Sequence, residues 1–73
     1  MDQRSALNVV AGLTAFEEEI VSLAGRGMSD REIASEKGIQ VHALRTAWLQ
    51  IREKLGAENR THAVAYAVRE GLI

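Results

Sequence analysis

Apolar residues recur along this chain at spacings of three and four, which is the period of an amphipathic helix. The longest such stretch has its apolar positions at Leu44, Trp48, Ile51 and Leu55. Two further stretches repeat in the same way, one before it and one after it: Phe16, Ile20, Leu23 and Ala24, then Ala63, Val64, Ala67 and Val68. No segment alternates apolar and polar residues as a strand does. The pattern therefore predicts an all-α fold.

Capping residues and glycines mark where these helices should begin and end. Thr14 with Glu17, and Ser29 with Glu32, fit the capping box, in which a hydroxyl and a carboxylate three residues apart satisfy the first free amides. Asn59 is a good N-cap for the last helix. Glycines follow the expected helices, because glycine readily adopts the left-handed conformation that ends a helix. These signals predict helices at about 15–26, 30–37, 41–55 and 60–70.

The remaining segment, residues 1–12, carries weaker signals and is interpreted as an N-terminal leader to one domain at 13–73. Its apolar residues Leu7, Val9 and Val10 either pack on the core or belong to a frayed segment, and both alternatives remain open.

Composition excludes several classes of protein. The 73 residues contain no cysteine, which excludes a disulfide framework and a thiolate metal site. There is neither a run of about 18 apolar residues nor a basic leader followed by an apolar segment, so no membrane span or signal peptide is expected. We therefore expect a cytoplasmic protein with no membrane partner.

No pattern of catalytic or cofactor-binding residues is present. His42 and His62 have no partner at ligand spacing, so no metal site is predicted. The chain has no glycine-rich phosphate loop, no nucleophile elbow and no paired acid and base. We expect neither an enzyme nor a cofactor.

The segments at 30–37 and 41–55 are joined by a short turn at Gly38, an arrangement typical of a helix-turn-helix. Since the apolar positions of 41–55 define an inner face, the residues between them lie on the outer side of that helix. A helix displayed in this way can enter the major groove of double-stranded DNA. The pattern therefore indicates nucleic-acid recognition by helix 41–55.

Charge is distributed unevenly along the chain. The net charge of −1 is unusual for a DNA-binding domain, because phosphate contacts dominate affinity. Residues 1–40 hold four basic and seven acidic side chains, whereas residues 41–73 hold five basic and three acidic ones. The cations therefore concentrate in the half that contains the predicted recognition helix.

The candidate DNA contacts lie in that second half: Arg45, Thr46, Leu49, His42, Arg52, Lys54 and Arg60. Arg45 can donate a pair of hydrogen bonds to guanine, or it can be a solvated arginine. Arg52, Lys54 and Arg60 can contact phosphates, although Lys54 and Arg60 also lie at helix ends, where cations are ordinary. Trp48 shares the spacing of the inner face and is expected in the core or at its edge.

Residues 13–73 resemble the LuxR/GerE-type helix-turn-helix domain, which occurs at the C-terminal end of quorum-sensing and response regulators and sometimes as a standalone protein. The resemblance rests on an ordered set of matches at 13–14, 17–21, 27–34, 55–56, 59–61, 63–65 and 71–73. It implies a four-helix domain in which the second and third helices read DNA and the fourth often pairs two protomers. A homodimer through the fourth helix is thus implied, with its surface supplied by Val64, Tyr66, Ala67 and Val68.

The recognition helix departs from the pattern of that family. Where members usually have a serine or threonine cap, and a threonine three residues later, this chain has Gln40 and Ala43. Loss of such a cap typically costs ~1 kcal/mol. The outward positions, where members show a cation, a variable residue, histidine and a polar residue, read Arg45, Thr46, Ala47 and Leu49. Leu49 can touch a thymine methyl but cannot read guanine or hold a phosphate.

Two functions remain open. The first is a DNA-binding transcriptional regulator that reads the major groove with helix 41–55 as a dimer. The alternative is a protein-binding antiactivator or modulator, which pairs its helix-turn-helix surface with a larger transcription regulator. The acidic net charge, the apolar Leu49 with Ala43 and Ala47, and the absence of an input domain in these residues favour the alternative.

Overall fold

The computed structural model describes residues 12–73, and within that range the chain forms four helices. They are α2 (Ala15–Gly25), α3 (Asp30–Lys37), α4 (Val41–Leu55) and α5 (Arg60–Arg69). No strand occurs in this part of the chain, which confirms the all-α class. The four helices begin at the predicted residues and end within one residue of the predicted ends. The leader residues Leu7, Val9 and Val10 lie outside the described residues.

Local side chains explain where α2 and α3 begin. Both predicted capping boxes are present. Thr14 Oγ1 accepts from the Glu17 amide at 3.1 Å, and Glu17 Oε1 accepts from the Thr14 amide at 2.9 Å. Ser29 and Glu32 exchange the same pair of bonds at 3.2 and 2.8 Å. Gln40 makes no side-chain cap at the start of α4, as its residue type indicates. Among the described helices, α2 and α3 are therefore started by bonds that span only three residues.

The turn between α3 and α4 is made by a glycine in the left-handed conformation. Gly38 has φ of 68° and ends α3, and the next amide, that of Ile39, donates to the Ala34 carbonyl at 2.9 Å. A side chain with a Cβ atom resists this φ, which is why glycine fits here. The chain thus passes from α3 to α4 in three residues, as the helix-turn-helix pattern requires.

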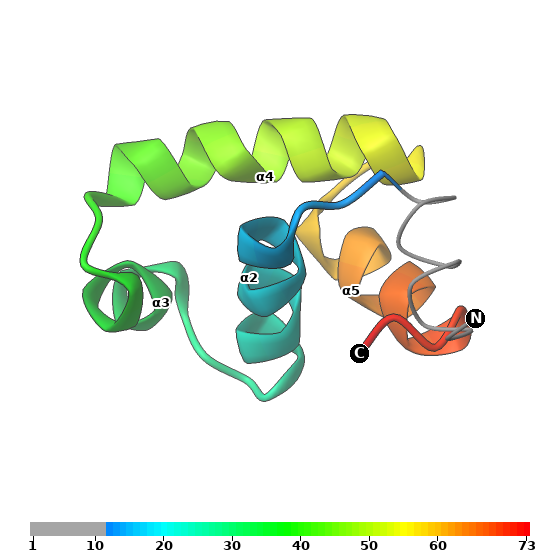
Figure 1. Cartoon of the computed structure of the whole chain (residues 1–73), viewed down its shortest axis with the longest axis horizontal. Helices are drawn as coiled ribbons and strands as arrows, with labels where there is room; N and C mark the ends of the chain where they lie inside the picture. Colours follow the sequence, from blue (N-terminus) through cyan, green and yellow to red (C-terminus); the bar gives the residue numbers. More distant parts are fainter. Residues whose placement is uncertain (1–11) are drawn as a thin grey trace.

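The core lies on one side of α4. Figure 1 shows α4 along one edge of the molecule, with α2, α3 and α5 all on its inner side. Leu44 and Ile51 of α4 are fully buried, and Trp48 and Leu55 are nearly so. They meet the apolar residues of the other helices, among them Ile20, Val21, Ile33, Ala63 and Ala67. Because burying each large side chain contributes about 1.5–3 kcal/mol, this inner face fixes the rotation of α4 about its axis.

None of the described helices has the length and apolar character needed to cross a membrane.

A buried carboxylate joins α2 to the end of α4. Glu17 is 5% exposed, and its Oε1 accepts from Lys54 Nζ at 2.6 Å. Burial alone would raise the pKa of Glu17, but the bonds from Lys54 and from the Thr14 amide outweigh it and hold the pKa below its ordinary value of 4.5. The charged form of Glu17 therefore stabilises the fold.

This ion pair predicts an acid-sensitive part of the stability. Because the pKa of Glu17 is lower in the folded state than in the unfolded chain, its contribution is present above about pH 4.5 and is lost as the pH falls through the folded-state pKa. We expect Glu17→Gln to lower the free energy of unfolding near neutral pH and to make it less dependent on pH between about 5 and 3. Urea denaturation at a series of pH values measures both effects.

The matched control is Glu53→Gln, because Glu53 is exposed on α4 and has no part in this ion pair. Some acid sensitivity should persist in Glu17→Gln, since the bonds from Ser29 also lower the pKa of Glu32. An unchanged pH profile in Glu17→Gln would contradict the assignment.

Candidate nucleic-acid interface

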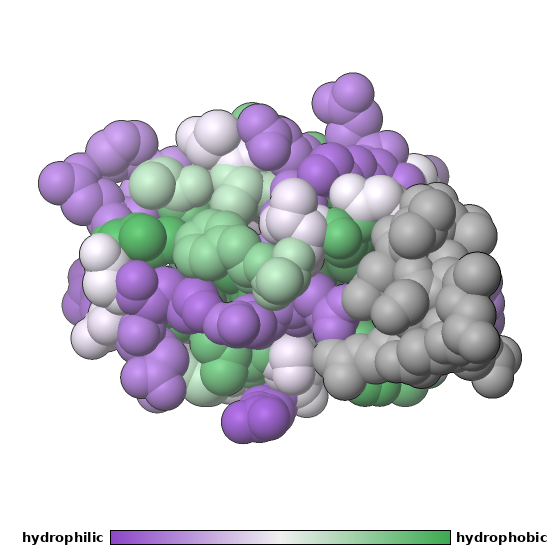
Figure 2. Space-filling model, in the orientation of Figure 1, coloured by the Kyte–Doolittle hydropathy of each residue, from purple (hydrophilic) through white to green (hydrophobic). Residues whose placement is uncertain are grey.

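The outer face of α4 is open to solvent. Four of its exposed residues follow one another at intervals of three, one and three and form a single row along the helix: His42, Arg45, Thr46 and Leu49. We call this row the α4 stripe. It lies on the side of the helix away from the buried Leu44 and Ile51. In Figure 2, drawn in the same orientation as Figure 1, hydrophilic side chains project along the edge that α4 forms.

The chemistry of the α4 stripe is set by three side chains. Arg45 is exposed, and no partner among residues 12–73 holds its guanidinium. Thr46 Oγ1 donates to the His42 carbonyl at 3.2 Å, so its hydroxyl hydrogen is directed at the backbone of its own helix. Leu49 is 62% exposed. The stripe therefore offers a free cation beside an apolar side chain.

The other predicted cations already have partners within the fold. Arg52 is half-buried and donates through Nη2 to the Glu58 carbonyl, and Lys54 is paired with Glu17 as described above. Arg60 donates from Nε to Asp30 Oδ1 at 3.0 Å and from Nη2 to the Met28 carbonyl at 2.7 Å. The structure therefore does not gather these three cations beside Arg45 as a free basic patch.

Asp30 joins three helices. Its Oδ1 accepts from Trp48 Nε1 of α4 at 3.1 Å and from Arg60 Nε of α5 at 3.0 Å. The Arg60 guanidinium also lies 5.2 Å from the centroid of the Trp48 ring, within range of a cation–π interaction. Sequence reasoning placed Trp48 at the core but did not connect these residues, because they are 18 and 30 positions apart. The network holds α4 against the first residue of α3.

One further exposed cation, Arg31, was not predicted from the sequence as a DNA contact. Arg31 is exposed on α3 and has no partner within residues 12–73. Its neighbours Ile33 and Ala34 face the core, so the helical period alone could have placed Arg31 outward. In a helix-turn-helix the first helix crosses the DNA backbone, where such a side chain can contact phosphate.

The predicted dimer surface on α5 is divided between core and solvent. Ala67 is fully buried and belongs to the core of this chain, whereas Val68 is 59% exposed. Val64 and Tyr66 are half-buried. The Arg69 guanidinium lies over the Tyr66 ring, 5.4 Å from the centroid of the ring. The open part of this surface is therefore formed mainly by Val68 and Val64.

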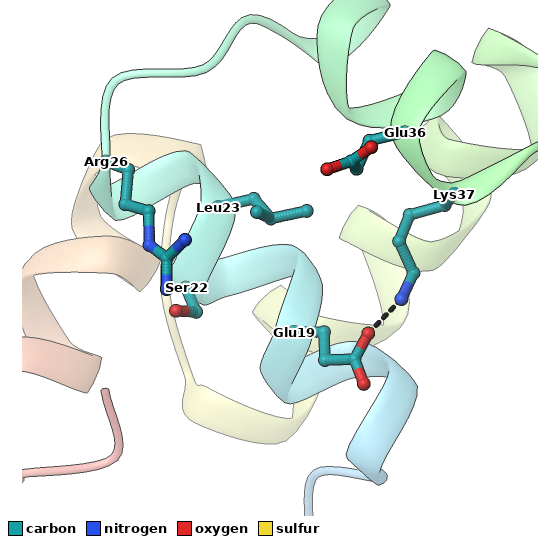
Figure 3. Close-up of a pocket in the computed structure, with 6 residues that line it drawn as sticks. All are labelled: Glu19, Ser22, Leu23, Arg26, Glu36 and Lys37. Atoms are coloured by element: carbon teal, nitrogen blue, oxygen red, sulfur yellow. Dashed lines mark hydrogen bonds and ion pairs between the residues drawn. The ribbon is translucent and has the colours of Figure 1, made fainter.

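A shallow groove of about 340 Å³ lies between α2 and α3, away from the α4 stripe. Figure 3 shows the side chains around it, with Lys37 and Glu19 pointing at each other and forming an ion pair. Its lining also holds Arg26 and Glu36, so two cations face two anions. A groove without net charge does not favour a polyanion such as DNA. The α4 stripe is the better candidate interface.

Comparison with known proteins finds response regulators among the relatives of this chain. The response regulator protein VraR of Staphylococcus saprophyticus subsp. saprophyticus is 40% identical over 73 residues, which is all of this chain and 34% of the relative. The proteins of the same name from Staphylococcus aureus and Staphylococcus epidermidis are 41% identical over 61 residues, which is 84% of this chain and 29% of each relative. The chain thus spans about a third of the length of the curated relatives it matches. No protein-family model matches it, and no solved structure gives a significant match.

Proposed function

We propose that this chain is a LuxR/GerE-type helix-turn-helix domain that regulates transcription by binding double-stranded DNA with α4 in the major groove. The observation that carries the proposal is the α4 stripe: it faces solvent on a helix whose opposite face is buried, and its Arg45 has no partner among the described residues. The similarity to response regulators supports a regulatory role.

A dimer is part of this proposal. Arg45 and Arg31 are the cations that we assign to DNA contact in each protomer, so one protomer alone should bind weakly. Two protomers joined through Val64 and Val68 of α5 would place two copies of α4 on half-sites about one helical turn apart. Doubling the contacts in this way makes specific binding possible with few cations per chain.

A second candidate function is favoured by Leu49. Its side chain is 62% exposed in the α4 stripe, and the whole chain has a net charge of −1. Exposed apolar surface on a small domain often marks a protein partner. On this alternative, the chain modulates a larger transcription regulator by pairing with it through the helix-turn-helix surface.

A salt titration with Leu49→Lys tests both candidates. If α4 faces DNA, the wild type should lose roughly a hundredfold in affinity for nonspecific duplex between about 50 and 200 mM salt. This is the loss expected for about four phosphate contacts, made by Arg31 and Arg45 of each protomer on a duplex that lacks the specific site. Leu49→Lys should then bind several times more tightly at the lower salt, because the new cation can reach phosphate. Fluorescence anisotropy of labelled duplex measures both effects.

The control is Leu49→Ala, which removes the apolar side chain without adding charge and should leave the nonspecific affinity nearly unchanged. Absence of binding by the wild type at 50 mM salt would contradict the DNA-binding proposal and direct the search to a protein partner. In that case Leu49→Lys should weaken the partner complex instead.

A further inference from the structure

Two neighbouring side chains of the α4 stripe have opposite chemistry. Arg45 carries only hydrogen-bond donors, and Leu49 has no polar atom. From this pairing, and resting on the proposed function, we infer that each half-site contains a guanine read by Arg45 and a thymine whose methyl group contacts Leu49, within about two base pairs of each other.

The spacing follows from helix geometry. Residues four apart in an α-helix lie about 6 Å apart along the axis and differ by about 40° in direction, so Arg45 and Leu49 project from adjacent turns to nearly the same side. Successive base pairs are about 3.4 Å apart. When the axis of α4 follows the groove, which runs obliquely to the DNA axis, the path per base pair is longer than this rise, so the two side chains reach bases about one to two steps apart.

The choice of bases follows from donors and acceptors. Guanine presents two acceptors in the major groove, N7 and O6, which match the paired donors of Arg45. Thr46 does not compete as a donor, because its hydroxyl hydrogen is directed at the His42 carbonyl. An amino group of adenine or cytosine placed against Leu49 would lose its hydrogen bond to water, whereas the thymine methyl gains apolar contact.

The fold holds α4, and with it both side chains, in a fixed orientation. Leu44, Trp48 and Ile51 hold the inner face of the helix, and Asp30 fixes Trp48 through its Nε1 hydrogen. The spacing of Leu49 from Arg45 is therefore set before DNA binds.

The test removes one recognition group of the DNA at a time, either a thymine methyl or a guanine N7. Duplexes that the full chain retains from a random library are resynthesised with deoxyuridine for each thymine, and separately with 7-deazaguanine for each guanine. At one thymine per half-site, loss of the methyl should weaken binding about fourfold, the factor expected for one buried methyl group. Leu49→Ala should abolish that effect, and Arg45→Ala should abolish the effect of 7-deazaguanine at a guanine within about two base pairs of that thymine.

Phe16→Ala is the matched control, because it removes another exposed apolar side chain, 41% exposed on α2, and should leave both sensitivities intact. If the wild type binds duplex with strong salt dependence but no thymine methyl matters, or if the methyl effect persists in Leu49→Ala, this inference is wrong and the proposed function stands. If no duplex is bound at low salt, the proposed function fails as well.

Discussion

Leu44→Ala is expected to lower the free energy of unfolding by about 3 kcal/mol, whereas Leu49→Ala, five residues further along α4, should change it by less than about 0.5 kcal/mol. The reason is burial, since Leu44 is fully buried and Leu49 is 62% exposed. The same substitution in the same helix thus leaves a cavity at one position and removes a solvated side chain at the other. Urea denaturation followed by circular dichroism measures both values.

The difference matters because small domains have little stability to lose. A domain of this size commonly has a free energy of unfolding near the lower end of about 5–15 kcal/mol, so Leu44→Ala should leave a measurable unfolded fraction at moderate temperature. DNA binding should then weaken in Leu44→Ala only as far as the folded fraction falls. Equal losses of stability in the two variants would show that the outer face of α4 is covered in solution, for example by a second protomer.

The helices could be predicted because their signals are local. A capping box spans three residues, as with Thr14 and Glu17, and a left-handed glycine such as Gly38 acts at a single position. The inner face of α4 repeats within one helix, so Leu44 and Trp48 could be assigned to the core from spacing alone. Each of these inferences needs only residues that are neighbours in sequence.

The candidate site was harder to predict from the sequence, because whether a cation is free to contact DNA depends on residues that are distant in sequence. Arg60 looked like a phosphate contact at the start of a helix, but its partner Asp30 lies 30 positions earlier. Lys54 is likewise paired with Glu17, 37 positions away. The helical period placed Ala67 on the apolar face of α5, and the family resemblance assigned it to the dimer surface, but neither showed that the core covers it completely. Only the tertiary structure separates the cations that stabilise the fold from those that remain free.

Arg45 is free among residues 12–73, whereas Arg60 is paired within the fold. The same substitution, arginine to glutamine, should therefore have opposite effects at these two positions. Arg45→Gln should weaken binding to the selected duplex by a factor of about 5 to 150, the range for a lost arginine–guanine pair, and leave the free energy of unfolding nearly unchanged. Arg60→Gln should lower the free energy of unfolding by about 1–2 kcal/mol, because its bonds to Asp30 and to the Met28 carbonyl are lost. Its DNA affinity, measured where the protein is folded, should stay within about threefold of the wild type.

For both variants, anisotropy titration measures the DNA affinity and urea denaturation measures the free energy of unfolding, under the same buffer conditions. If Arg60→Gln weakened DNA binding as much as Arg45→Gln while leaving stability intact, Arg60 would have to exchange Asp30 for a phosphate in the complex. Trp48 would then keep only its own bond to Asp30, so α4 would be held less firmly in the bound state. The predicted result requires instead that the network of Asp30, Trp48 and Arg60 persists on DNA, with α4 presented in the orientation that the free chain already has.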